Sequence, residues 1–166
     1  MNIRFRAFPF LAVAFLISQT VLADDQGTSD HGRYLVKLGG CNDCHTPGYA
    51  QAAGDLPQAQ WLTGNAVGFQ GPWGTSYPSN LRLYVQNHTE REWLAKVRQP
   101  MRPPMPWFSL RDMTDEDLLA IYRFIRGLGP AGEPAPVAVA PGGPVNTAFI
   151  DFTPKRLPRQ AQAETR

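Results

Sequence analysis

Apolar residues recur at helical spacing most clearly near the end of the chain, in residues 114–128. The apolar positions there are separated by three or four residues and are Leu118, Ile121, Tyr122, Ile125 and Leu128. This spacing places them on one face of a helix. Thr114 suits the N-cap position, and the acidic residues that follow it favour the positive end of the helix dipole. We therefore predict a helix from Thr114 to Leu128.

Two shorter helices are predicted earlier in the chain. The first begins at the candidate N-cap Ser29 and ends before Gly39-Gly40. Its apolar stripe consists of Tyr34, Leu35 and Leu38. The second begins at Thr89, which forms the capping-box pattern with Glu92, and continues through Val97.

Glycine and proline interrupt the rest of the chain, which contains 15 Gly and 16 Pro among 166 residues. Residues 46–81 have the turn residues of a long loop, and the four prolines within 99–107 predict a stiff, extended segment. Residues 148–152 look like a short strand in an arm laid across the domain. We predict one domain of short helices and long loops over 24–130, and a Pro-rich extended arm over 131–166.

Residues 1–23 have the pattern of a secretory signal peptide. Arg4 and Arg6 form a basic start, residues 8–17 are nearly all apolar, and Ala23 is a small residue at the expected cleavage point. The apolar run is too short to span a bilayer, which takes about 20 residues. We expect cleavage and export to the periplasm, with an uncleaved membrane anchor as the alternative.

Removal of this peptide changes the charge balance. The whole chain has 16 basic and 14 acidic residues, a formal charge of +2. Without Arg4 and Arg6 the balance is 14 against 14, so the charge gives no indication of a nucleic-acid partner. Two cysteines are too few for a disulfide framework, a four-cysteine zinc site or an iron–sulfur cluster.

Both cysteines belong to one pentapeptide, Cys41-Asn42-Asp43-Cys44-His45. The pattern C-x-x-C-H is typical of c-type haem attachment. Two thiols three residues apart on a helical turn can reach the two vinyl groups of one porphyrin and form thioethers. The adjacent His45 can then be held beneath the iron, so we predict one covalent haem c.

Other uses of the two cysteines are weaker hypotheses. A thioredoxin-type dithiol needs a strand–helix–strand context, which does not precede Cys41. A zinc site would need more ligands than His31, His45 and His88 provide at paired spacing. A disulfide between Cys41 and Cys44 remains an alternative in an oxidising compartment.

A haem bound by one histidine needs a second axial ligand or leaves a coordination position open. The candidates in the mature chain are Met101, Met105, Met113, His31 and His88. Met105 lies between Pro104 and Pro106, and these prolines predict a rigid loop that holds the sulfur in place. We predict Met105 as the sixth ligand, with Met101 as the alternative and Met113 as a core residue.

Residues 28–130 resemble the class I cytochromes c. The resemblance rests on a helix bearing Gly32 that leads into CNDCH, and on Met105-Pro106-Trp107 followed by a capped helix. It implies an all-α fold of short helices and long loops wrapped around one covalent haem, with Met105 as axial ligand. It also implies that the first and last helices cross, with Gly32 against the aromatic ring of Tyr122.

A narrower resemblance is to bacterial periplasmic monohaem cytochromes that accept electrons as subunits of dehydrogenases. It rests on Gly71-Pro72-Trp73-Gly74-Thr75-Ser76-Tyr77, on Asn80-Leu81, and on the arm sequence 149–154. A haem of this kind implies hydrogen-bond donors for its propionates, and the candidates are Trp73, Tyr77, Asn80 and Arg82. We also expect a backbone carbonyl, with Pro57 as the candidate, to accept a hydrogen bond from the second ring nitrogen of His45.

These features predict a one-electron carrier rather than an enzyme. The expected partners are a periplasmic or membrane-bound dehydrogenase as donor and an oxidase or another cytochrome in the respiratory chain as acceptor. Contact with a membrane would be indirect, through these partners. The alternatives are a haem enzyme or gas sensor with an open sixth position, and a haem-free dithiol redox protein.

Overall fold

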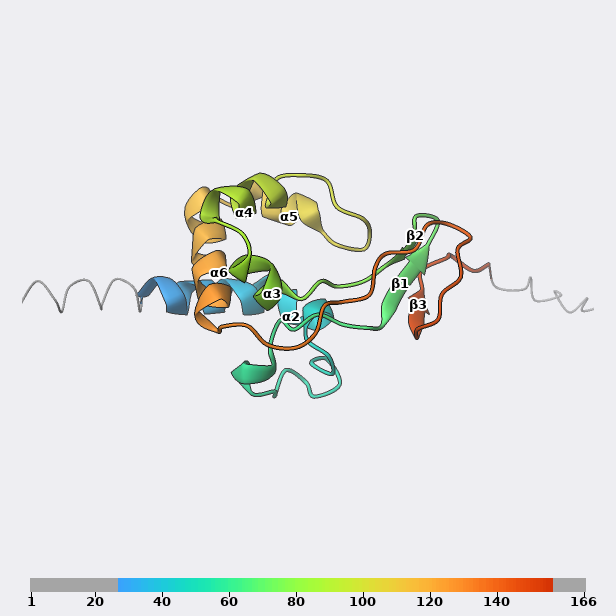
Figure 1. The fold of residues 1–166 in the computed structure, drawn as a ribbon, viewed down its shortest axis with the longest axis horizontal. Coiled ribbons are helices and arrows are strands. Elements are labelled where there is room, and N and C mark those ends of the chain that lie inside the picture. The colour runs from blue at the N-terminus through green and yellow to red at the C-terminus, as the bar shows by residue number, and fades with distance from the viewer. Residues whose placement is uncertain (1–26, 157–166) are drawn as a thin grey trace, which may run out of the picture.

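The computed structural model describes residues 27–156, and most of its regular structure is helical (Figure 1). After a helical stretch over residues 27–38, the helices are α2 (Cys41–His45), α3 (Leu81–Gln86), α4 (Glu90–Val97), α5 (Trp107–Asp112) and α6 (Asp115–Gly127). A short 3-10 turn, η1, covers Gln58–Gln60, and the strands are β1 (Gly68–Gly71), β2 (Gly74–Ser76) and β3 (Phe149–Asp151). The signal-peptide prediction, residues 1–23, lies outside the described residues. The described helices fit the expectation of a helical chain with long loops, but the all-α expectation missed the three-stranded sheet.

The two predicted capped helices form as expected. The Thr114 hydroxyl accepts a hydrogen bond from the Asp117 amide at 3.1 Å, which starts α6. Thr89 and Glu92 form both bonds of a capping box at the start of α4. Each cap satisfies amide groups that have no partner within the helix. The apolar face of α6 is buried, and with the other helices it forms the core of the described domain.

The first helix differs from its prediction. Helical structure already includes residue 27, so Ser29 lies inside the helix and is not its N-cap. The buried residues of this helix are Gly32 and Val36, whereas Tyr34 is 58% and Leu38 is 69% exposed. The predicted apolar stripe was therefore wrong for these two residues.

Gly32 brings the first helix against α6, as the crossing prediction required. A Cβ atom at Gly32 would lie 2.1 Å from the carbonyl oxygen of Ala120 and 2.8 Å from the Cβ of Phe124. The aromatic partner is thus Phe124, and the predicted partner Tyr122 was wrong. Tyr122 lies on another side of α6, where its hydroxyl donates a hydrogen bond to the carbonyl oxygen of His88 at 2.6 Å.

The sheet joins the loop before α3 to the C-terminal arm. Its order is β2-β1-β3, with β1 antiparallel to β2 and parallel to β3. Gly74 has a φ of 93°, and a Cβ there would lie 2.2 Å from the Val139 carbonyl oxygen. Because only glycine fits, Thr75 can pair with Val139 through two backbone hydrogen bonds of 2.9 Å.

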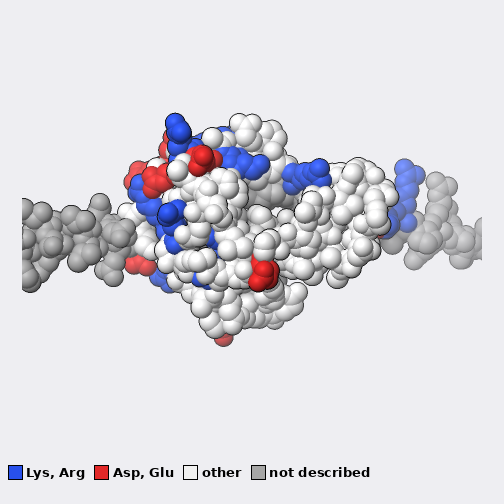
Figure 2. Space-filling view, in the orientation of Figure 1, with Lys and Arg blue, Asp and Glu red and all other residues white. Residues whose placement is uncertain are grey.

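The molecule has a helical part and a sheet part (Figure 1). On the face shown in Figure 2, charged side chains gather over the helices, and the surface of the strands and arm is mostly uncharged. Within residues 27–156, none of the helices has the length and apolar character needed to cross a membrane.

Candidate functional site

The C-x-x-C-H motif forms the single helical turn α2. Gly40 precedes it with a φ of 65°, a left-handed conformation that glycine adopts easily. Cys41 and Cys44 are both half-buried free thiols. Since residues three apart lie on the same face of a helix, both sulfur atoms can point to one side of α2.

His45 ends this turn and is 7% exposed. Its Nδ1 atom lies 2.7 Å from the carbonyl oxygen of Ser79. A carbonyl can only accept, so Nδ1 carries the proton and the lone pair is on Nε2. Burial lowers the pKa of the imidazole, and the bond to Ser79 opposes this only in part. The expectation of a backbone carbonyl was correct, but the acceptor is Ser79 and not Pro57.

Nε2 of His45 forms no hydrogen bond with any residue in the described part of the chain. A neutral imidazole with a fixed tautomer and one uncommitted nitrogen is the form that binds a metal ion. No group of three or more His, Cys, Asp or Glu side chains is placed to hold a metal ion within residues 27–156. The arrangement on α2 therefore offers one imidazole ligand beside two thiols.

The two thiols are kept protonated by their surroundings. Burial raises the pKa of Cys41 to about 11 and also raises the pKa of Cys44, with Asp43 adding to both effects. Dithiol oxidoreductases need the opposite, a thiolate stabilised at neutral pH. The chemistry at α2 thus gives no support to a thioredoxin-like function and is compatible with thioether formation.

A small polar network, which we did not predict from the sequence, holds α2 against the rest of the domain. The Thr46 hydroxyl donates to the Asn42 side-chain oxygen at 2.7 Å and accepts from the Leu62 amide at 2.8 Å. Asn42 and Thr46 are each 1% exposed, and the Asn42 side-chain nitrogen is buried without a partner. The spacing of four residues between Asn42 and Thr46 was a usable sequence signal.

Met105 lies in a loop whose backbone is fixed on both sides of it. Its amide donates to the Arg102 carbonyl at 3.3 Å, and its carbonyl accepts from the Trp107 amide at 2.8 Å. The Ser76 hydroxyl holds the same loop to β2 through the Pro103 carbonyl at 2.6 Å. The Met105 side chain is half-buried.

The other candidate axial ligands have different surroundings. Met101 and Met113 pack against the hydrophobic core. His31 bonds to the carboxylate of Asp117 at 2.8 Å. His88 stacks on the ring of Tyr84 and bonds to its carbonyl at 2.8 Å.

The four predicted propionate donors all have protein partners. The Trp73 indole donates to the Phe69 carbonyl at 3.3 Å, and the Tyr77 hydroxyl pairs with the Thr147 hydroxyl at 2.7 Å. The first bond lies within the β1–β2 hairpin, and the second joins the residue after β2 to the arm. A contact of Trp73 or Tyr77 with a propionate stays a prediction.

Asn80 and Arg82 hold the segment that leaves α6. The Asn80 amide donates to the carbonyls of Ala131 and Glu133, at 2.8 and 3.1 Å. Arg82 is 5% exposed, and it donates to the carbonyls of Ala59, Leu128 and Gly129. Burial lowers the pKa of this guanidinium, although carbonyls at a helix end favour a cation. Their contact with a propionate also stays a prediction.

Three curated proteins are similar to this chain in sequence. Two are "Alcohol dehydrogenase (quinone), cytochrome c subunit" proteins, from Gluconacetobacter polyoxogenes and Komagataeibacter europaeus. Each is 32% identical over 143 residues, covering 75% of this chain. The third is the "Gluconate 2-dehydrogenase cytochrome c subunit" of Pantoea cypripedii, 30% identical over 133 residues and 70% of this chain. The chain spans 28% of the length of each of these relatives. No protein-family profile and no solved structure matches it.

Proposed function

We propose that the chain is a cytochrome c similar to the cytochrome c subunits of dehydrogenases, and that it carries single electrons through one covalently bound haem. The residues of α2 fit such a group, because two protonated thiols share one helical turn with a buried imidazole that has an uncommitted Nε2. When bound, the haem supplies an iron that alternates between the ferric and ferrous states. Cys41 and Cys44 would hold it through thioethers, and His45 would provide one nitrogen ligand to its iron.

The bond between His45 and Ser79 is the observation that carries this proposal. It fixes the tautomer, aims Nε2 away from the carbonyl and raises the basicity of the ring toward iron. Because His45 is 7% exposed, water has little access to this ligand. A fixed ligand in an apolar setting favours a small rearrangement on electron transfer.

We further propose Met105 as the sixth ligand. Met101 and Met113 already have packing roles in the core, and His31 and His88 have hydrogen-bond partners. The backbone bonds around Met105 reduce the entropy lost when its sulfur is held in one position. Occupation of the sixth position by this side chain would exclude oxygen chemistry and favour the carrier over a haem enzyme or gas sensor.

The names of the relatives support a dehydrogenase as partner, whereas the acceptor and the location rest on the sequence alone. We propose a dehydrogenase as electron donor, an oxidase or another cytochrome as acceptor, and the periplasm as the location. Trp73, Tyr77, Asn80 and Arg82 stay as proposed propionate contacts, which would have to add to their present hydrogen bonds or replace them.

Haem staining after denaturing electrophoresis tests covalent attachment. The protein is expressed with its own leader in a host that matures cytochromes c, beside the double variant Cys41→Ala/Cys44→Ala. The wild-type band should stain and the double variant should not. An unstained wild-type band, or equal staining of both, would overturn the proposal, and an unstained band whose thiols cycle with a dithiol reductant would favour the dithiol alternative.

A further inference from the structure

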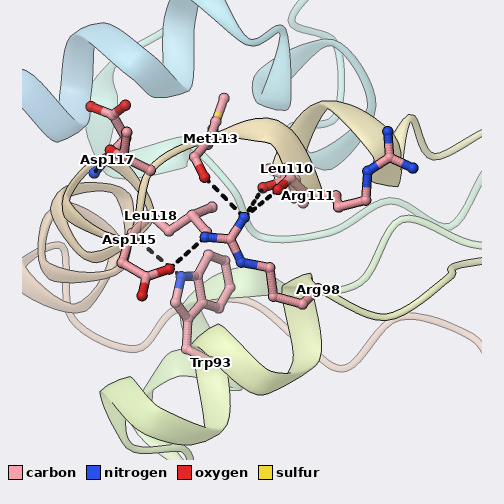
Figure 3. Close-up of polar contacts among 9 residues, drawn as sticks. Trp93, Arg98, Leu110, Arg111, Met113, Asp115, Asp117 and Leu118 are labelled. Carbon is pink, nitrogen blue, oxygen red and sulfur yellow. Dashed lines mark hydrogen bonds and ion pairs between the residues drawn. The ribbon is translucent and has the colours of Figure 1, made fainter.

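One arginine closes the base of the loop that carries Met105. Arg98 follows α4 as its C-cap residue, and its Nη1 atom donates to the carbonyl oxygens of Leu110, Arg111 and Met113. Its Nη2 atom bonds to the carboxylate of Asp115 at 2.5 Å. Figure 3 shows the guanidinium between these groups, so a single side chain joins residue 98 to residues 110–115.

The acceptors explain why this position suits arginine. The three carbonyls lie at the C-terminal end of α5 and at its C-cap, where backbone carbonyls have few partners within the helix. The Leu110 carbonyl also accepts a hydrogen bond from the Met113 amide at 3.3 Å. A cation at such an end is also favoured by the helix dipole. The planar guanidinium presents five donors in a fixed fork, whereas a lysine ammonium presents three at a single point.

Other contacts already hold α4 to α6. The Trp93 indole donates to the Leu118 carbonyl at 2.9 Å, and Arg123 forms an ion pair with Glu90 at 2.7 Å. Pairing of these two helices therefore does not depend on Arg98 alone. What Arg98 adds is closure of the intervening segment, whose far end is held by the bond between Ser76 and Pro103.

We propose that Arg98 is a positioning residue for the sixth axial ligand. It fixes the two ends of the loop, so that opening of the loop, and with it departure of the Met105 sulfur from iron, requires its hydrogen bonds to break. This inference rests on the proposed function and deepens it. Bonds to a charged donor are stronger than neutral ones, so their loss should be measurable.

The test compares wild type with Arg98→Gln, Arg98→Lys and the control Arg123→Gln, all as haem-loaded full-length proteins. The control removes a surface ion pair between α4 and α6 but leaves the loop closed. The first readout is the rate at which imidazole binds ferric protein, since imidazole must wait for the methionine to leave. The second is amide hydrogen exchange at Met105 and Trp107, which does not depend on the iron.

We expect Arg98→Gln to raise the imidazole-binding rate and the exchange of these amides by about tenfold, with Arg98→Lys between it and wild type. Arg123→Gln should change both readouts by less than about twofold, even if it lowers stability slightly. If Arg98→Gln does not fold, the same two readouts are compared between Arg98→Lys and Arg123→Gln. A larger increase in Arg98→Lys then supports the positioning role of Arg98.

Equal effects of the Arg98 and Arg123 variants, or no effect of either, would overturn the role of Arg98 while leaving the carrier function intact. Failure of the proposed bond between Met105 and iron would be recognised by a separate result, in the wild-type protein. In that case ferric wild type lacks the far-red absorption band of methionine-bound iron and binds imidazole at once, and the positioning role falls with it.

Discussion

The Nδ1 atom of His45 lies 2.7 Å from the carbonyl oxygen of Ser79, 34 residues further along the chain. Two stretches that are distant in sequence thus meet at the proposed iron ligand. A second link runs beside it, where the Gly64 amide donates to the carbonyl oxygen of His45 at 2.8 Å. The orientation of the imidazole therefore depends on how closely residues 64 and 78–80 approach each other.

Gly64→Ala tests this approach. A Cβ at Gly64 would lie 2.8 Å from the Asn80 amide nitrogen and 3.1 Å from the Pro78 carbonyl oxygen, so the segment bearing Ser79 must move. The matched control is Gly48→Ala, because Gly48 has a similar φ of 76° but open space around it. We expect Gly64→Ala to lower the free energy of unfolding by about 1–3 kcal/mol more than the control, with a lower haem content per chain. Equal losses, measured by urea unfolding, would contradict this account.

Gly32→Ala tests the helix crossing. The new methyl group would meet the carbonyl of Ala120 at 2.1 Å, so we expect a loss of at least about 2 kcal/mol in unfolding free energy. Gly127→Ala is the control, since Gly127 is in α6 with nothing within 4 Å of a Cβ atom, and it should be neutral or stabilising. Thermal unfolding of both variants measures the difference, and a tolerated Gly32→Ala would refute the tight contact.

Asn80→Ala separates two roles for this side chain. The amide holds the carbonyls of Ala131 and Glu133, so its loss should speed proteolysis within residues 131–147 several-fold. Asn80→Asp is the companion variant, because it keeps the side-chain oxygen that caps α3 but loses the donors. A shift in reduction potential without faster proteolysis would instead favour the propionate role.

Asp117→Asn tests a pH-dependent contact between the first helix and α6. A hydrogen bond from His31, together with one from Thr114, lowers the pKa of the Asp117 carboxyl. A carboxyl whose pKa is lower in the folded state adds stability above its unfolded pKa of about 3.9, and this stability is lost as the pH falls through the folded value. The free energy of unfolding of wild type should exceed that of the variant by at most about 1 kcal/mol near neutral pH, because the His31–Asp117 pair is partly exposed. The gap should close in acid, and a gap that persists unchanged at pH 3 or below would contradict the assignment.

The sequence predicted those parts of the fold that depend on local chemistry. The caps Thr89 and Thr114 act within one helical turn, so their residue types alone locate the starts of α4 and α6. Likewise C-x-x-C-H is a contiguous motif, and its spacing alone predicts that both cysteines lie on one side of a helical turn. The short helices α3 and α5 were missed, since each has six residues and too little periodicity for a pattern.

Long-range relationships could not be read from the sequence. The carbonyl that meets His45 comes from Ser79 and not Pro57, because any residue has a carbonyl and only the path of the loop selects one. The rotation of α6 likewise decides that Phe124 faces Gly32. The donors Trp73, Tyr77, Asn80 and Arg82 were recognised as important polar groups, but their partners could not be predicted. Those of Tyr77 and Asn80 lie in the arm, at the other end of a long stretch of chain.

The ferric absorption spectrum of the haem-loaded protein shows whether the Met105 sulfur binds the iron opposite His45. Iron bound by a methionine sulfur has a weak far-red band, and we expect this band in wild type and in Met101→Ala. The same spectrum of Met105→Ala should lack it and show an open site that binds carbon monoxide readily when reduced. A wild type without the band, or a Met105→Ala variant that retains it, would contradict electron transfer through a haem held by His45 and Met105.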